Sequence, residues 1–239
     1  MTKLYSVDFT KEQTLDEAIW NIAVGEKWAN NELQQYTDSK NNLFFNEEGL
    51  VIKATYQDGI YKSARIHTKD KLYFKYGRVD IVASVPSGKG TWPALWMMPN
   101  DSVYGGWPKS GEIDIMEHVG NEKDMLYMCI HTEGYNHRRK EQYFHTKTLP
   151  NIADHFHKYS IEWTEDSITY YVDDEKMHTY TKGEEGKDTT HIGWPFDQPF
   201  YLIMNLAVGG SLGGPVDTND FPQTFTIKSI DIETFDNEL

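Results

Sequence analysis

The sequence predicts an all-β protein of the β-sandwich or jelly-roll type. Helical periodicity is scarce, and only residues 11–22 could form a short helix or turn. Elsewhere, short runs rich in β-branched and aromatic residues recur between Gly, Pro and Asn, as in proteins built from many short strands. No linker, repeat or low-complexity tract divides the 239 residues, so we expect one domain over residues 1–239.

The expected strands are short apolar or alternating runs. In chain order they are residues 50–54, 78–83, 125–131, 159–163, 167–172, 200–207 and 224–235. Residues 172–176, Val-Asp-Asp-Glu-Lys, are typical of a hairpin turn with an acidic tip.

Three further segments are expected to be loops. Residues 99–110 are rich in Gly, Pro and aromatic residues, and residues 209–215 contain too much glycine for regular structure. Residues 134–150 carry a local basic patch that includes His137 and Arg138, and a solvated loop is the preferred interpretation of it.

The most informative segment is the acidic run at residues 111–117. Alternation along a strand places Glu112 and Asp114 on one face and the two isoleucines between the acids on the other. Strict alternation would send Glu117 to the opposite face. One extra residue in the strand, a β-bulge near residues 115–116, would return Glu117 to the row of acids.

Three interpretations of this row are open from the run alone. It could be a solvated strand face, which is the common fate of charged residues. It could bind a hard cation such as calcium or magnesium. It could also hold a pair of catalytic carboxyl groups tuned by a third. The aromatic residues just upstream, Trp92, Trp96, Tyr104 and Trp107, favour the third interpretation, because such rings stack on the apolar faces of sugars.

Composition limits the partners. The formal net charge of −14 disfavours nucleic acid and, more weakly, anionic polymers, so a neutral ligand is expected. Cys129 is the only cysteine, which rules out an intrachain disulfide, and its apolar surroundings predict a buried structural thiol. No run of apolar residues is long enough to span a membrane.

Several motifs together resemble glycoside hydrolase family 16, a family of endo-β-glucanases. They are residues 31–37, 61–66, 76–78, 90–99, 111–117, 194–197, 205–210 and 221–223, and they cover nearly the whole chain in order. The resemblance implies a jelly-roll β-sandwich of two curved antiparallel sheets with a concave substrate cleft. It also implies hydrolysis with retention of anomeric configuration. The acids match the longer, bulged signature Glu-x-Asp-x-x-Glu.

The resemblance also assigns roles to residues. Glu112 would be the nucleophile, Glu117 the general acid and then base, and Asp114 the group between them that positions Glu112. Sugar contacts or supporting residues would be Arg65, Trp96, Trp107, His131, Asn205, Asn31 and Trp92. Gln34 is a further candidate. Arg65 could instead form a surface salt bridge, His131 could be a core histidine, and Trp92 could pack under the cleft floor.

Two positions depart from the family pattern. Residues 211–215 replace a Trp-Pro segment found in many laminarin-cleaving relatives, which leaves room for mixed-linkage substrates. Lys228 stands where an Asp that binds calcium is expected, and an ammonium group cannot ligate a cation. We therefore expect no metal site and no cofactor.

The sequence thus predicts a retaining endo-β-glucanase on neutral β-1,3- or mixed β-1,3-1,4-glucans. A transglycosylase on the same scaffold and a non-catalytic β-glucan-binding module are the rival hypotheses. We expect a monomer that is extracellular, cell-surface or periplasmic, with its signal segment already removed from this sequence.

Overall fold

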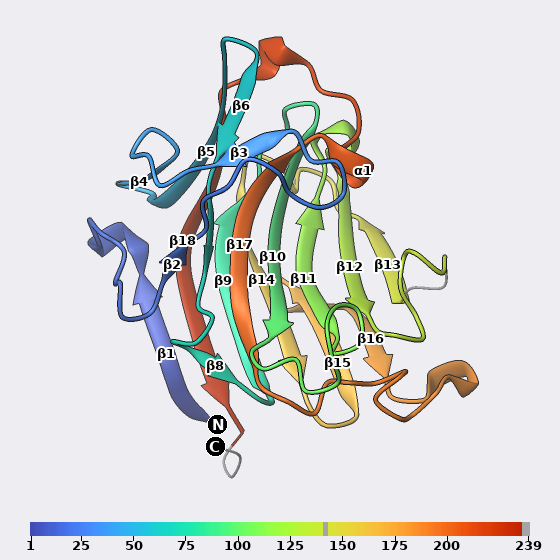
Figure 1. Ribbon diagram of the computed structural model, residues 1–239. Coiled ribbons are helices and arrows are strands. Elements are labelled where there is room, and N and C mark those ends of the chain that lie inside the picture. The colour runs from blue at the N-terminus through green and yellow to red at the C-terminus, as the bar shows by residue number, and fades with distance from the viewer. Residues whose placement is uncertain (141–142, 236–239) are drawn as a thin grey trace.

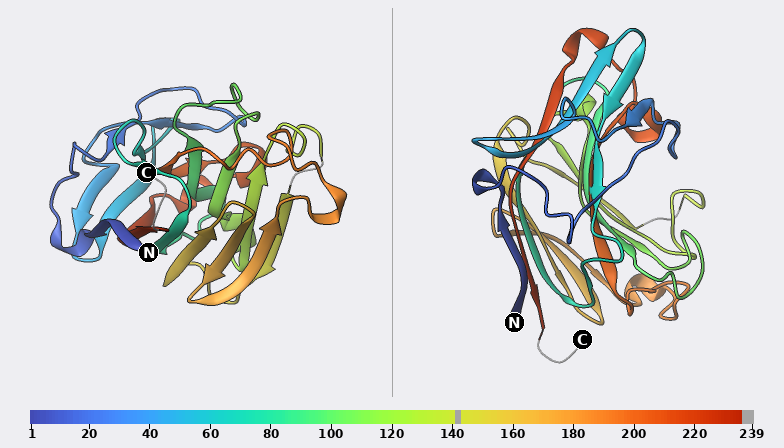
Figure 2. Two further views of the ribbon diagram at one scale, coloured as in Figure 1. Left: turned by 90° about the horizontal axis from the view of Figure 1, so that it is seen from below. Right: turned by 60° about the vertical axis from the view of Figure 1, so that its left-hand side comes forward.

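The computed structural model describes residues 1–140 and 143–235, and two stacked, curved β-sheets dominate it (Figures 1 and 2). Among the described residues the larger sheet has ten strands. Its main path runs β16 (Glu175–Thr181), β15 (Ser167–Val172), β14 (Phe156–Trp163), β9 (Gly77–Ser84), β18 (Gln223–Thr234), β5 (Gly49–Gln57), β6 (Ile60–Ser63) and β3 (Gln34–Tyr36). Two strands lie off this path: β1 (Thr2–Asp8) pairs with β18, and β4 (Leu43–Asn46) pairs with β5.

The smaller sheet, with eight strands in the described part of the chain, faces the viewer in Figure 1. Its path runs β13 (Tyr143–Thr148), β12 (Met125–His131), β11 (Glu112–His118), β10 (Thr91–Pro99), β17 (Phe200–Val208), β7 (Arg65–His67) and β2 (Asn21–Ile22), and β8 (Tyr73–Phe74) pairs with β17. Short helical turns complete the structure: α1 (Gly210–Gly213) and the 3₁₀ turns η1 (Phe9–Lys11), η2 (Gly120–Glu122), η3 (Glu184–Gly186) and η4 (Thr218–Asp220).

The all-β prediction and all seven predicted strands are confirmed. The acidic turn is confirmed as well, because Asp173 and Asp174 join β15 to β16 with φ values of 51° and 66°, as in a type I′ hairpin. The expectation of purely antiparallel sheets is wrong for β3 and β6, which pair in parallel. Residues 12–20 form turns, and no α-helix is present there.

Two segments that we expected to be loops contain regular structure. Within residues 134–150, β13 forms an edge strand against β12, whereas residues 141–142 lie outside the described part of the chain. The polar and basic residues of β13 suggested a solvated loop. They occur in a strand because one face of an edge strand is exposed to water. Within residues 209–215, α1 is a single helical turn between Gly209 and Gly214, whose positive φ values of 66° and 69° suit glycine.

The hydrophobic core lies between the sheets and follows from strand alternation. In β9, Val79, Ile81 and Ala83 are buried in the core, whereas Arg78 and Asp80 point to the outer surface. Trp20 and Trp163 are buried in the same core. None of the helices in the described residues is long and apolar enough to cross a membrane.

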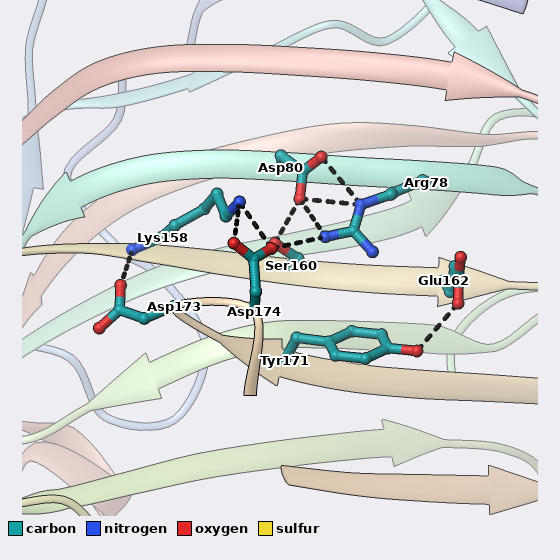
Figure 3. A network of polar contacts seen from close by, with 8 residues as sticks. All are labelled: Arg78, Asp80, Lys158, Ser160, Glu162, Tyr171, Asp173 and Asp174. Atoms are coloured by element: carbon teal, nitrogen blue, oxygen red, sulfur yellow. Dashed lines mark hydrogen bonds and ion pairs between the residues drawn. The ribbon is translucent and has the colours of Figure 1, made fainter. Parts of the chain in front are cut away.

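A polar network covers the outer face of the larger sheet (Figure 3). The Arg78 guanidinium donates to both carboxylate oxygens of Asp80, from Nε at 2.9 Å and from Nη2 at 2.8 Å. The same guanidinium lies 5.2 Å from the ring centre of Tyr171, whose hydroxyl donates to Glu162. Lys158 pairs with Asp174 at the neighbouring turn.

This network predicts a modest stability effect. The Arg78→Ala variant should lose about 1 kcal/mol of unfolding free energy, because the paired charges are partly exposed and water screens them. Urea denaturation measures the loss. A loss of several kcal/mol of unfolding free energy would contradict this prediction, because it would mean that the guanidinium supports the core.

Candidate active site

The predicted β-bulge is present in β11. Against β12, Asp114 faces Cys129 and Glu117 faces Tyr127, so two residues of β11 oppose Met128 alone. On the other side, β10 shows the same shift between Leu95 and Trp96. The residues between the acids, Ile113, Ile115 and Met116, are all buried in the core. The extra residue therefore turns Glu117 to the same face as Glu112 and Asp114.

Two tryptophans hold the outer acids of this row. Trp107 Nε1 donates to Glu112 Oε2 at 2.7 Å, and Trp92 Nε1 donates to Glu117 Oε1 at 2.8 Å. Trp92 comes from β10, and Trp107 comes from the loop that precedes β11, where a cis peptide bond joins it to Pro108. Each indole N–H fixes the orientation of one carboxyl group and favours its ionised form.

Burial dominates the electrostatics of the acids. It raises the pKa of Glu112 to about 8 and that of Glu117 to about 7, while the charge of His131 and the indole hydrogen bonds act against it. Burial, followed by the charge of Glu117, also raises the pKa of Asp114 well above its usual range. The charge of Glu112 also raises the pKa of Glu117, but burial is the larger cause. The group therefore retains protons near neutral pH, where it can offer both a carboxylate and a carboxylic acid.

His131 faces the acids rather than the core. Its Nε2 lies 3.4 Å from Asp114 Oδ2 and 3.8 Å from Glu112 Oε1. Antiparallel register explains this position, since His131 on β12 is the direct partner of Glu112.

The cleft beside Glu112 has an aromatic wall organised around Arg65. Its guanidinium lies 4.8 Å from the ring centre of Trp96 and 5.2 Å from that of Trp28. Asn205 accepts a hydrogen bond from Trp96 Nε1 at 2.7 Å and donates to the Tyr36 hydroxyl at 3.0 Å. The alternative of a surface salt bridge for Arg65 is wrong, because the side chain lies between two rings that line the cleft.

The loop after β12 covers the other side of Trp107. The Arg138 guanidinium lies 4.6 Å from the ring centre of Trp107, and His137 packs 5.1 Å from it. Asn136 fixes this loop, because its buried amide donates to the Thr132 carbonyl and accepts from the Arg138 N–H. Both His137 and Arg138 line the cleft, so a simple solvated loop is the wrong interpretation for this part of residues 134–150.

The remaining predicted contacts divide between the cleft and its support. Trp92 lines the cleft and also contacts Glu117, so it does more than pack under the floor. Asn31 is exposed and does not line the cleft, whereas its neighbours Asn30 and Glu32 do. Gln34 is fully buried, and its amide donates to Glu32 at 2.7 Å, so it supports a cleft residue.

Some cleft residues were not predicted. Trp28, Glu32 and Asn30 come from the irregular segment before β3, and Phe144 and Leu212 lie beside Glu117 on β13 and α1. Phe144 is 45% exposed, and an exposed aromatic residue on an edge strand is the kind of signal that could have found it.

The position associated with calcium in the family does not fit a cation. Lys228 is exposed at a register shift in β18, and its ammonium group lies 5.7 Å from the ring centre of Phe156. A positive side chain at this point would repel calcium.

A β-sandwich whose cleft combines a bulged row of three acids with a wall of aromatic rings defines a glycoside hydrolase. Residues 28–228 match the family model of glycosyl hydrolases family 16, and the chain belongs to that family. The crystal structure of the laminarinase from Rhodothermus marinus has a TM-score of 0.92 and 38% identity, covering 99% of this chain and 98% of that one.

Curated relatives agree with this assignment. A β-glucanase of Rhodothermus marinus is 40% identical over 239 residues, which are 95% of this chain and 83% of the relative. Glucan endo-1,3-beta-glucosidase A1 of Niallia circulans is 40% identical over 243 residues, covering 91% of this chain and 36% of that longer protein.

Proposed function

We propose that this enzyme is a retaining endo-β-glucanase that hydrolyses β-1,3-glucans and mixed-linkage β-1,3-1,4-glucans. The observation that carries the proposal is the pairing of Glu112 and Glu117 across the bulge, each held by its own indole donor, in a cleft lined by aromatic rings. The glucanase names of the similar proteins support the same substrate class.

The reaction proceeds by double displacement. Glu117 donates its proton to the glycosidic oxygen while the Glu112 carboxylate attacks the anomeric carbon, which breaks the glycosidic bond and forms a glycosyl ester. The Glu117 carboxylate then takes a proton from water, which attacks the same carbon and releases Glu112. Asp114, which lies on the same face of β11 as Glu112, positions the nucleophile during both steps. The chemistry uses only these side chains and water.

The cleft favours a neutral polymer. Its aromatic faces can stack on glucose rings, and Glu32 adds a half-buried acid to those of the bulged strand. Carboxylates in the cleft would repel sulfated or acidic sugars. The Arg65 guanidinium lies over the Trp28 and Trp96 rings, and that of Arg138 lies over the Trp107 ring. These rings cover faces of the two cations that an anionic sugar could otherwise approach.

Product analysis on four glucans tests the substrate proposal. Laminarin, barley mixed-linkage glucan and lichenan should each give short oligosaccharides, while xyloglucan should remain intact. Cleavage of xyloglucan alone would overturn the proposal. Chains longer than the donor would identify a transglycosylase, and binding without products would identify a non-catalytic module.

Loss of either indole donor should change a different side of the pH profile. Activity requires ionised Glu112 and protonated Glu117, so the unmodified enzyme should be most active around pH 7 to 8, where both raised pKa values lie. Below this range Glu112 is protonated, and above it Glu117 is ionised. Trp107→Phe should raise the pKa of Glu112 and reduce activity on the acid side by about tenfold.

Trp92→Phe should raise the pKa of Glu117, so that the proton is retained and activity extends to higher pH. The measurement is the ratio of kcat/KM on the alkaline side of the optimum to that on the acid side, since this ratio cancels any uniform loss of sugar stacking. The ratio should rise in both variants, through loss on the acid side for Trp107→Phe and gain on the alkaline side for Trp92→Phe. Unchanged profile shapes would show that the indoles do not tune the acids.

We also propose that the enzyme acts outside the cytoplasm as a monomer. Long glucans do not cross membranes, and the net charge of −14 makes copies of the chain repel one another. Fractionation of the native host and light scattering of the purified protein test these two points; a cytoplasmic pool or a stable dimer would contradict them.

A further inference from the structure

β12 places a thiol and an imidazole opposite two of the acids. In the antiparallel register, Cys129 is the direct partner of Asp114, and His131 is the direct partner of Glu112. Directly opposed residues project from the same face of a sheet, and residues two apart on one strand do the same. The register alone therefore gathers carboxylate, sulfur and imidazole ligands on the cleft face.

Two of the three separations between the donor atoms are those that a tetrahedral metal needs. His131 Nε2 lies 3.4 Å from Asp114 Oδ2 and 3.5 Å from Cys129 Sγ, and one donor atom from each of the three residues lies within 4.8 Å of the others. Zinc bonds of about 2.0–2.3 Å at tetrahedral angles place neighbouring ligand atoms roughly 3.3–3.8 Å apart. Both measured separations fall within that range.

One of these ligand atoms also lacks a hydrogen-bond donor in the described part of the chain. Asp114 Oδ2 accepts no hydrogen bond from the residues that the structure describes, although Asp114 is only 3% exposed. A buried carboxylate oxygen without a donor costs free energy, and a bound cation would satisfy it. Cys129 and His131 line the part of the cleft beside Glu117, which provides a path for an ion.

We propose that Asp114, Cys129 and His131 form a zinc-binding site in which the bound ion blocks catalysis. A set of sulfur, nitrogen and oxygen donors selects zinc over calcium and magnesium, which prefer oxygen alone. The thiol proton, now donated to the Tyr143 carbonyl at 2.9 Å, is released to solvent when the Cys129 thiolate binds the metal. Any proton on Asp114 leaves in the same way.

Bound zinc should inhibit the enzyme because it occupies Asp114 and lies beside Glu112. A zinc ion on Asp114 removes that side chain from Glu112, and the positive charge beside Glu112 weakens its carboxylate as a nucleophile. This consequence rests on the proposed glucanase mechanism, whereas metal binding itself does not.

Cobalt spectroscopy and calorimetry test binding without any glucan. Because Cys129 is the only cysteine, a thiolate-to-cobalt charge-transfer band after addition of Co²⁺ can come only from this site. Titration with ZnCl₂ should show one equivalent bound, and Cys129→Ser should bind zinc at least about tenfold more weakly and lose the cobalt band. If the Ser variant does not fold, the cobalt charge-transfer band of the unmodified protein still shows whether Cys129 binds the metal. Absence of the band, or equal zinc affinity in Cys129→Ser, would overturn the proposal.

Activity assays then test the consequence. Zinc should inhibit laminarin hydrolysis by the unmodified enzyme, EDTA should restore it, and the ratio of activities with and without zinc should approach one in Cys129→Ser. His178→Ala is a matched control, because His145 and His178 form another close imidazole pair with ring centres 4.1 Å apart. Relief of inhibition by His178→Ala, with Cys129→Ser still inhibited, would assign the effect to that pair. An enzyme that binds zinc at Cys129 but cleaves no glucan would refute the proposed function alone.

Discussion

Glu112→Ala should reduce hydrolysis of laminarin by roughly 10⁴-fold or more while the fold remains intact. The loss follows from the position of Glu112, whose Oε2 is held by Trp107 and whose carboxylate is the proposed nucleophile. Near-ultraviolet circular dichroism and the melting temperature report on the fold. Glu175→Ala, at the exposed start of β16 on the other sheet, is the matched control and should retain full activity.

Azide gives this variant a sharper test. With the side chain of Glu112 removed, azide can enter the space and attack an activated aryl β-glucoside from the face that the carboxylate occupied. The product should be the α-glycosyl azide. Normal turnover by Glu112→Ala, or formation of the β-glycosyl azide, would contradict the assignment of the nucleophile.

Glu117→Ala should have the second largest effect, a loss of roughly 10²–10⁴-fold on natural glucans. Glucans have poor leaving groups and need the proton that Glu117 supplies. An activated aryl glucoside does not need this proton, so it should still form the glycosyl-enzyme and release the aryl group in a burst. Comparison of the pre-steady-state burst on the aryl substrate with turnover of laminarin measures the difference.

Azide should also restore turnover of the aryl glucoside by Glu117→Ala, but with the opposite product. Here azide attacks the glycosyl-enzyme in place of activated water, so the β-glycosyl azide forms. The two variants thus give opposite anomers if the roles are as proposed. The same anomer from both variants would contradict the division of roles across the bulge.

The bulge could be predicted because it follows from local rules. Glu112 and Asp114 obey strand alternation and Glu117 violates it, so only an extra residue restores a single row of acids. The strands themselves were predictable for the same reason, since alternation in segments such as residues 78–83 reflects burial on one face.

The cleft edges could not be predicted because they depend on tertiary packing. Asn30 and Asn31 both have positive φ, so the chain leaves strand geometry there and alternation no longer tells which side chain faces the cleft. The family resemblance points to Asn31, whereas its neighbours Asn30 and Glu32 line the cleft. Arg138 reaches the cleft only because buried Asn136 folds its loop over Trp107.

For Cys129, burial can be predicted from its own strand, but its neighbours across the sheet cannot. Its burial was predicted correctly from apolar neighbours, yet the face it occupies depends on the register between β11 and β12. The register can be predicted only when it is known which strands pair. It places the Cys129 thiol beside Asp114 and His131.

The stereochemistry of the first product tests the central claim most directly. Proton NMR of a laminari-oligosaccharide during hydrolysis by the unmodified enzyme should show the β-hemiacetal first, followed by slow mutarotation to the α form. This result is expected if Glu112 forms a glycosyl-enzyme that water cleaves with help from Glu117. Initial release of the α-hemiacetal would contradict the double-displacement account of this bulged pair of carboxyl groups.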